Sequence, residues 1–301
     1  MSEIAKQAEG KWPGILRQLG IPDEFLKNKH GPCPICEGKD RYRFDDKNGR
    51  GGYYCHGCGA GDGWMLLMKY NNWSFREAAT EVESIIGTVD KSKPVQKKDP
   101  KFMLRRIYQM LKPIGESEAY KYLISRRLTI IPDDLKSIPA FDYYEDGKKQ
   151  GRYSAMVGLV VDVDNNPLTY HITYLQNAKK APVDHPKKIM TPIRSITGGA
   201  IRLFGEGDHI YVTEGIETAI AVHSKTSRPV WAAISAGGME ALKLPESVKR
   251  VTVCGDNDMS YAGQKAAYAL ANRLAVREKR DVDVRIPKQV GTDWLDEITG
   301  G

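Results

Sequence analysis

The sequence predicts a multi-domain α/β protein: a small metal-binding module, then an α+β segment, then a parallel sheet flanked by helices. Three observations support this prediction. Four of the five cysteines form two close pairs near the N-terminus. Residues 90–100 are rich in lysine and proline and nearly free of apolar side chains, which is typical of a linker. From residue 206 onward, short apolar strands alternate with helices, and this rhythm is typical of a parallel sheet covered on both faces.

Length and composition limit the possible classes of protein. A chain of 301 residues is long enough for two or three domains, and its 41% hydrophobic content is sufficient for ordinary cores. The net charge of +7 suits a polyanionic partner but does not by itself establish one. The sequence contains no apolar run long enough to span a membrane, and the N-terminal residues lack the apolar core of a secretion signal. We therefore expect a cytosolic protein, in which paired cysteines bind metal and do not form disulfides.

The linker divides the chain, and a change of pattern divides the part that follows it. Between the linker and residue 206, helical patterns come first (roughly 101–111 and 116–127) and extended patterns come after (153–163 and 168–176). We predict four regions, at residues 1–89, 90–100, 101–205 and 206–301.

The elements of the last region follow one another in regular order. Each predicted strand is a short apolar run, and each is followed by a segment of helical pattern or by a loop. The predicted strands are 209–213, 229–234, 250–254 and 281–286, and the predicted helices are 216–224, 238–244 and 261–278. This order predicts a parallel sheet whose strands all end at the same edge.

The paired cysteines predict a structural zinc site. Cys33 and Cys36 form one pair, and Cys55 and Cys58 form a second after 18 intervening residues. Two thiolates separated by two residues on a tight turn can bind one Zn²⁺, and two such turns complete a closed tetrahedron. We therefore expect one structural Zn²⁺ per chain, with His56 as a bystander inside the second turn.

The residues between the two pairs predict a hairpin with two different faces. Alternation places Arg41 and Arg43 on one face and Tyr42 and Phe44 on the other. For the arginines we favour contacts with nucleic-acid phosphates. The aromatic side chains, with Trp64, either stack on unpaired bases or pack against a neighbouring helix, and we favour packing.

Four carboxylates are predicted to gather at one edge of the C-terminal sheet. Glu214 follows the strand 209–213, Asp256 and Asp258 follow the strand 250–254, and Asp293 follows the last strand after a short loop. Any one of them alone is weak evidence, because such residues are common in solvated turns. Together they form a cluster that repels itself unless cations bind, and oxygen ligands suit Mg²⁺ or Mn²⁺. Glu217, one turn into the next helix, is expected to orient this site.

These motifs together resemble a known arrangement of two modules. The spacing of Glu214-Gly215, Asp256-Asn257-Asp258 and Asp293 resembles the Toprim domain of bacterial primases, topoisomerases and some nucleases. The segment PCPICEGKDRYRF…YYCHGCGAGDG is similar to the zinc ribbon of satellite-phage and plasmid primases. The stretch LQNAKKAPVDHPKKIM followed by AIRLF, which precedes the Toprim-like part, also resembles that family. The string EGIETA departs at two positions from the EGYATA-like motif of the phage members but keeps Glu214. The resemblance covers most of the chain.

The resemblance implies a DNA primase for phage, plasmid or mobile-element replication. It would synthesise short RNA primers on a single-stranded DNA template from ribonucleoside triphosphates, using two or more Mg²⁺ or Mn²⁺ ions. Glu214, Asp256 and Asp258 would be the catalytic residues, and the zinc ribbon would read the template or hold the nascent primer. The protein would act in the cytosol of a bacterium or of a phage-infected host. The expected template- or triphosphate-binding residues are Lys179, Lys180, Lys187, Lys188, Arg194 and Arg202.

Two other functions remain open from the sequence. A Toprim nuclease would use similar metal ligands, although the zinc ribbon disfavours it, and a topoisomerase would need a further large domain with a tyrosine nucleophile. A non-catalytic zinc-ribbon DNA-binding protein would have a decayed carboxylate site. The sequence has no GxxxxGK[ST] phosphate loop, so we expect no motor activity and a separate replicative helicase as a partner.

Overall fold

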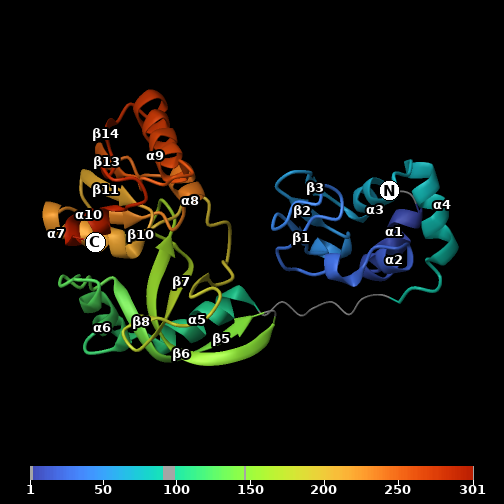
Figure 1. Cartoon of the computed structure of the whole chain (residues 1–301), viewed down its shortest axis with the longest axis horizontal. Helices are drawn as coiled ribbons and strands as arrows, with labels where there is room; N and C mark the ends of the chain where they lie inside the picture. Colours follow the sequence, from blue (N-terminus) through green and yellow to red (C-terminus); the bar gives the residue numbers. More distant parts are fainter. Residues whose placement is uncertain (1–2, 91–98, 146, 301) are drawn as a thin grey trace. The chain divides into compact units, whose positions relative to one another are not determined.

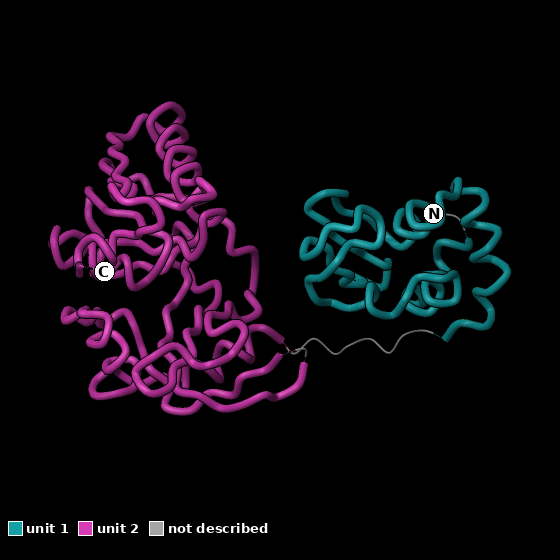
Figure 2. Tube along the Cα trace, in the orientation of Figure 1, with its two compact units in different colours: residues 1–97 teal, residues 98–301 magenta. Residues whose placement is uncertain are grey.

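The computed structural model describes residues 3–90, 99–145 and 147–300, and it divides the chain into two compact units, 1–97 and 98–301 (Figure 2). Most of the predicted linker lies outside the described residues. At its C-terminal end, Asp99 is the N-cap of α5 and Pro100 is the first residue of that helix. No helix in the described parts of the chain is long and apolar enough to cross a membrane.

The first unit is a three-stranded antiparallel sheet between helical segments (Figure 1). Residues 45–52 connect β1 to β2, and residues 56–58 connect β2 to β3. A side-chain cap starts each of the two longer helices, Asp62 for α3 and Ser74 for α4. The elements are α1 Glu3–Ala8, α2 Trp12–Gln18, β1 Tyr42–Phe44, β2 Tyr53–Cys55, β3 Gly59–Gly61, α3 Gly63–Asn71 and α4 Phe75–Ile85.

The hairpin aromatics belong to the core of this unit. Tyr42 and Phe44 are each 2% exposed and pack with Trp12 in one apolar cluster, and Trp64 packs on its edge. The packing interpretation is therefore confirmed, because buried rings are not available to stack on bases.

The second unit begins with helices and a strongly bent antiparallel sheet of order β4-β5-β6-β7-β8, with β9 paired to β7 (Figure 1). The long strand β5 was not predicted, because Pro139 and Asp142 interrupt its apolar pattern and a register shift accompanies them. The elements are α5 Pro100–Met110, β4 Lys112–Pro113, α6 Glu118–Ser125, β5 Leu135–Glu145, β6 Lys148–Val161, β7 Pro167–Gln176, β8 Lys179–Lys180 and β9 Lys187–Ile189.

The rest of the unit contains the predicted parallel sheet. Its order is β10-β12-β11-β13-β14, in which the last four strands are parallel and β10 is antiparallel to β12. The elements are β10 Ile201–Leu203, β11 His209–Thr213, α7 Ile216–Thr226, β12 Val230–Ala232, α8 Ala236–Ala241, β13 Arg250–Cys254, α9 Ala262–Asn272 followed by a π turn Arg273–Arg277, β14 Asp281–Arg285 and α10 Trp294–Thr299.

The two sheets of this unit share one hydrophobic core. Leu123 of α6, Met156 of β6 and Ile216 of α7 belong to the same buried cluster. Gly158 of β6 leaves room for this contact, since a Cβ there would lie 2.9 Å from the side chain of Ile201. Strand β10 also precedes residue 206, where we placed a domain boundary, so the sheet extends beyond that boundary. This shared core joins α6, β6 and β7 to α7, the helix that follows Glu214.

Candidate zinc and nucleotide sites

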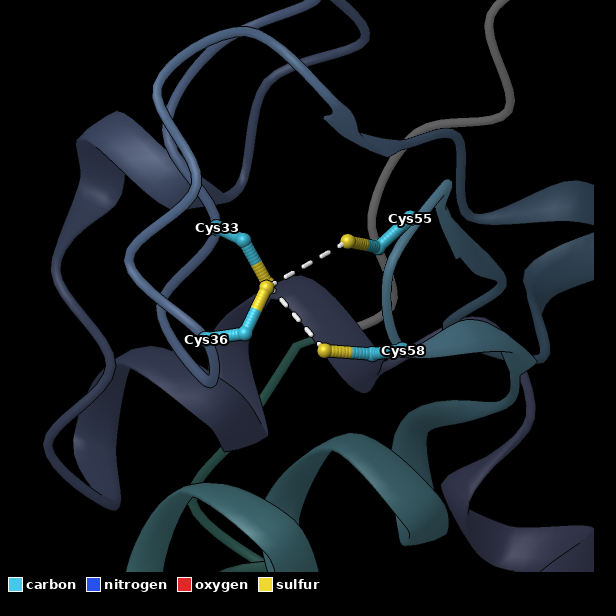
Figure 3. Close-up of side chains that lie close together, drawn as sticks. All are labelled: Cys33, Cys36, Cys55 and Cys58. Carbon is cyan, nitrogen blue, oxygen red and sulfur yellow. Dashed lines mark hydrogen bonds between the residues drawn. The ribbon is translucent and has the colours of Figure 1, made fainter.

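The four paired cysteines converge on one point in the first unit (Figure 3). The Cys33 and Cys58 sulfurs are 3.8 Å apart, as are those of Cys36 and Cys55, and all four lie within 4.8 Å of one another. With Zn–S bonds of about 2.3 Å, the sulfurs of a regular tetrahedron lie about 3.8 Å apart. The spacing of the sulfurs therefore fits a closed zinc site.

Backbone N–H groups donate to a cysteine sulfur in each of the two cysteine turns. The N–H of Ile35 donates to the Cys33 sulfur, and the N–H of Gly57 donates to the Cys55 sulfur, each at 3.4 Å. The backbone N–H of Gly38 is the main cause that lowers the pKa of Cys36 to about 7. Since zinc binds the deprotonated thiol, donors around sulfur favour metal binding.

Three of the four predicted carboxylates line one cavity of about 220 Å³ in the second unit. Glu214 stands directly after β11, Asp256 after β13, and Asp293 at the start of α10, so the ends of parallel strands bring them together. Asp258 is not among the lining residues. Its carboxylate accepts a hydrogen bond from the N–H of Gly263 at 2.9 Å, and its charge still acts on Glu214 and Asp256.

Backbone contacts hold the acidic loops in place. Ile234, which also lines the cavity, has a left-handed φ of 77° that is unfavourable for a β-branched residue. Its N–H donates to the carbonyl of Glu214 at 2.8 Å. Asn257 donates its backbone N–H to Thr292, and its side chain donates to Pro287 at 2.9 Å, which ties the loop after β13 to the loop before α10.

Asp256 is the carboxylate whose surroundings most favour a bound cation. Its pKa is raised to about 7. Burial is the largest cause, and the neighbouring charges of Asp293, Glu214 and Asp258 add to it. Its Oδ1 is buried and has no hydrogen-bond partner among the described residues. A buried carboxylate oxygen without a donor is costly unless a proton or a metal satisfies it. This orphaned oxygen in an oxygen-rich cluster fits Mg²⁺ or Mn²⁺.

Among the other lining carboxylates, Asp293 already has hydrogen-bond donors. Asp293 accepts from the N–H groups of Leu295 and Asp296 as the N-cap of α10, and from the Thr218 hydroxyl at 3.3 Å. Burial raises the pKa of Glu214, and Asp258 adds to this rise while Lys187 opposes it. Their carboxylate oxygens are more widely spaced than the cysteine sulfurs. Among the residues the structure describes, only the four cysteines form a group with all ligand atoms within 4.8 Å.

Glu217 also lines this cavity and belongs to a buried ionic network. Its carboxylate accepts from the Tyr122 hydroxyl at 2.8 Å and from the Lys187 ammonium at 3.0 Å. Burial tends to raise the pKa of Glu217, but the charge and hydrogen bonds of Lys187 and the Tyr122 hydrogen bond outweigh it and lower the pKa to about 2. Glu217 is therefore an anion at neutral pH and ties α7 to α6 and β9.

Basic residues also line this cavity. Lys180 of β8 and Lys187 of β9 are among those we predicted, and both are there. Tyr122 of α6 and Arg126, the C-cap of this helix, are there too, and the sequence analysis did not predict them. Their spacing of four residues, which puts them on one face of a predicted helix, is the signal that would have found them.

Three other predicted basic residues have structural partners elsewhere and do not line the cavity. Arg202 donates to the carbonyls of Asp162 and Val163 and lies over the Trp231 ring, 4.1 Å from its centroid. Lys188 pairs with Glu145 at 2.9 Å, and Arg194 pairs with Asp162 at 3.2 Å. Their roles in template or triphosphate binding stay predictions. Lys179, exposed on β8, does not line the cavity either.

The two ribbon arginines differ in their surroundings. Arg43 is half-buried on β1, with a guanidinium nitrogen 3.9 Å from an oxygen of Asp45. Arg41 precedes β1, and its side chain extends across Gly38 and Gly57, next to the cysteine cluster.

Models of known protein families match most of the chain. A zinc-binding domain of primase-helicase matches residues 28–64, and a Toprim domain matches residues 209–299. The chain combines a primase-type zinc ribbon with a Toprim domain. Between them, a domain of unknown function matches residues 98–203. At the level of the family, a zinc ribbon of this kind together with a Toprim domain is the architecture of a DNA primase.

Solved structures with some likeness to this zinc-ribbon and Toprim chain include several primases. A DNA primase domain from Pseudomonas aeruginosa is 15% identical, with a TM-score of 0.44, over 67% of this chain and 74% of that one. The zinc-binding and RNA polymerase domains of the Aquifex aeolicus primase are 16% identical, with a TM-score of 0.42, over 100% and 82%. The primase fragment of the bacteriophage T7 primase-helicase protein is 15% identical, with a TM-score of 0.36, over 90% and 95%.

Proposed function

We propose that this protein is a DNA primase that synthesises short RNA primers on single-stranded DNA in phage, plasmid or mobile-element replication. The observation that carries the proposal is the cavity of the Toprim domain, which is lined both by carboxylates at the strand ends and by Lys180, Lys187 and Arg126. A site with both metal ligands and cations suits a substrate that carries phosphates. The primase-type zinc ribbon in the same chain favours nucleotidyl transfer over DNA cleavage.

Glu214, Asp256 and Asp258 are the proposed catalytic residues, with Asp293 as a further metal ligand. Two or more bound Mg²⁺ or Mn²⁺ ions would supply charge stabilisation at the attacking and leaving oxygens of phosphoryl transfer. Asp256 offers its unpartnered Oδ1, while Glu214 borders the same cavity. Asp293 has less capacity to bind a metal, because one of its carboxylate oxygens already accepts the hydrogen bonds that cap α10.

The basic side of the cavity is proposed to bind phosphates of a ribonucleoside triphosphate or of the template. Burial lowers the pKa of Lys180, and the charge of Lys187 lowers it further. Two effects would therefore favour the binding of a polyanion. It is attracted by both cations, and it reduces the repulsion between them. Lys187 is held near the cavity by Glu217, so this buried carboxylate acts as a positioning residue.

The zinc ribbon is the proposed template-reading module, and a helicase from a separate chain is the proposed partner. Arg43 is the ribbon arginine that we assign to phosphate contacts. Phosphate contacts weaken with added salt, so binding of single-stranded DNA should be salt-dependent.

The test is to incubate the full chain with a panel of single-stranded DNA templates, labelled ribonucleotides and Mg²⁺ or Mn²⁺. We expect short labelled RNA from some templates and unchanged DNA length. Asp256→Asn and Asp258→Asn should each abolish synthesis without unfolding the protein, whereas Glu246→Gln, which changes an exposed acid on the same domain, should leave synthesis unchanged. Shortened DNA without RNA products would instead identify a nuclease. Wild-type synthesis by either aspartate variant would refute the assigned site.

A further inference from the structure

Arg41 occupies space that two glycines of the cysteine turns leave open. A Cβ at Gly38 would lie 2.2 Å from the Arg41 Nε and 2.8 Å from its Cζ, so no larger residue fits there without displacing the guanidinium. A Cβ at Gly57 would lie 3.1 Å from the Arg41 Nη1 and 3.4 Å from the Cys36 sulfur. The position of a Cβ at Gly57 is therefore close to both the Arg41 guanidinium and the Cys36 sulfur. This places the guanidinium beside the cysteine cluster.

The backbone of Arg41 is fixed, whereas its guanidinium has no other assigned partner. Its N–H donates to Gly31 at 3.1 Å, and its carbonyl accepts from the N–H of His56 at 3.0 Å, at the second cysteine turn. Within the described residues, no hydrogen bond or carboxylate ion pair involves the guanidinium. Arg43, in contrast, has Asp45 nearby. The guanidinium of Arg41 is therefore free to interact with the cysteine cluster beside it.

A zinc ion bound by four thiolates carries a net negative charge. An opposite charge within about 4–6 Å stabilises an anion, and groups around the ligands of a metal commonly tune its affinity. The guanidinium of Arg41 is in position to offset this charge next to Cys36, which is the exposed member of the four.

We propose that Arg41 is a positioning residue of the zinc site, whose guanidinium stabilises the thiolate-bound metal and shields Cys36, and that it does not serve chiefly as a contact for DNA. The inference rests on zinc binding by the ribbon and not on primer synthesis. Loss of an outer partner of this kind typically costs 10–100-fold in metal affinity. We therefore expect removal of the charge to speed zinc release roughly tenfold.

The experiment compares zinc-loaded full-length chains carrying Arg41→Met, Arg41→Lys or, as a control, Arg43→Met. Methionine keeps an unbranched apolar chain across the two glycines but removes the charge, and lysine restores it. Zinc release to a chromophoric chelator is followed over time, and affinity for labelled single-stranded DNA is measured at several salt concentrations. The absorption spectrum of the Co²⁺-substituted chains checks that each variant still binds metal through four thiolates.

We expect faster release from Arg41→Met, partial restoration in Arg41→Lys and wild-type release from Arg43→Met. The control should instead show weaker DNA binding with a smaller salt dependence. Unchanged zinc release from Arg41→Met, with a loss of DNA affinity like that of the control, would overturn the inference. Equal acceleration in all three variants would also overturn it, because the effect would then be general destabilisation of the ribbon. Neither outcome depends on primer synthesis, so both leave the proposed function to its own test.

Discussion

Replacing Asp256 by asparagine should stabilise the metal-free protein at alkaline pH while removing its response to Mg²⁺. Asp256 makes no hydrogen bond through its buried Oδ1, and burial with three nearby carboxylates raises its pKa to about 7. Folding therefore favours the protonated form of this group. Its contribution to stability is fully present below the ordinary pKa near 4 and is lost as the pH rises through 7. The amide is uncharged throughout, so the variant should not lose this stability.

The size of the effect follows from the pKa. The difference between the ordinary value of 3.8 and about 7 is roughly three pH units, and each corresponds to about 1.4 kcal/mol. The raised pKa therefore costs the folded protein at most about 4 kcal/mol of stability at alkaline pH. Because the cavity opens to solvent, we expect about half of this, or about 2 kcal/mol. For a unit of this size, 1 kcal/mol shifts Tm by about 2–4 °C, so the variant should melt about 4–8 °C higher at pH 8.

Thermal unfolding in chelator-treated buffer at pH 5 and pH 8 measures this difference, and Mg²⁺ is then titrated at pH 8. The wild type should gain stability with Mg²⁺ because a ligand that binds only the folded state stabilises it, whereas the variant should gain little. Glu246→Gln controls for the loss of one surface charge. If Asp256→Asn melts at or below the wild-type temperature at pH 8, or if Mg²⁺ stabilises both chains equally, then the crowded-carboxylate account of this site is wrong.

Three further predictions concern other parts of the chain. Cys33→Ser should release about one zinc per chain and unfold the first unit while the second keeps its own transition; metal analysis and calorimetry check this, and a zinc-free wild type would contradict it. Lys187→Met should cost about 2 kcal/mol near pH 7, because it leaves Glu217 buried without its cation. The wild type loses this advantage as the pH falls from the ordinary pKa of Glu217 near 4.5 toward 2, so denaturant midpoints of the two chains should converge in acid, and a constant difference would count against the ion pair. A chain beginning at Asp99, the cap of α5, should fold and extend a preformed primer weakly but initiate poorly; equal initiation by this shorter chain would show that the ribbon does not read the template.

Several features of the protein follow from short-range sequence patterns. Cys33, Cys36, Cys55 and Cys58 predicted their own cluster, because two-residue spacing on a tight turn leaves few other ways to arrange the sulfurs. The strands β11 and β13 were predicted at their observed bounds, since continuous apolar runs between polar turns are typical of a buried parallel sheet. The rule that strand ends share an edge then placed Glu214 and Asp256 in one cavity.

Tertiary structure alone decided which polar residues are near that cavity. Lys187 and Lys188 are neighbours in sequence, yet Lys187 pairs with Glu217, while Lys188 pairs with Glu145. Adjacent residues on a strand point to opposite faces, but which face meets the site depends on how β9 is placed against β7 and α7. Arg202 appeared suitable by charge and position, yet its guanidinium is bound to backbone carbonyls and to Trp231. Charge and spacing are local properties of a sequence, whereas the partner of a long side chain is set by packing between segments that are distant in the chain.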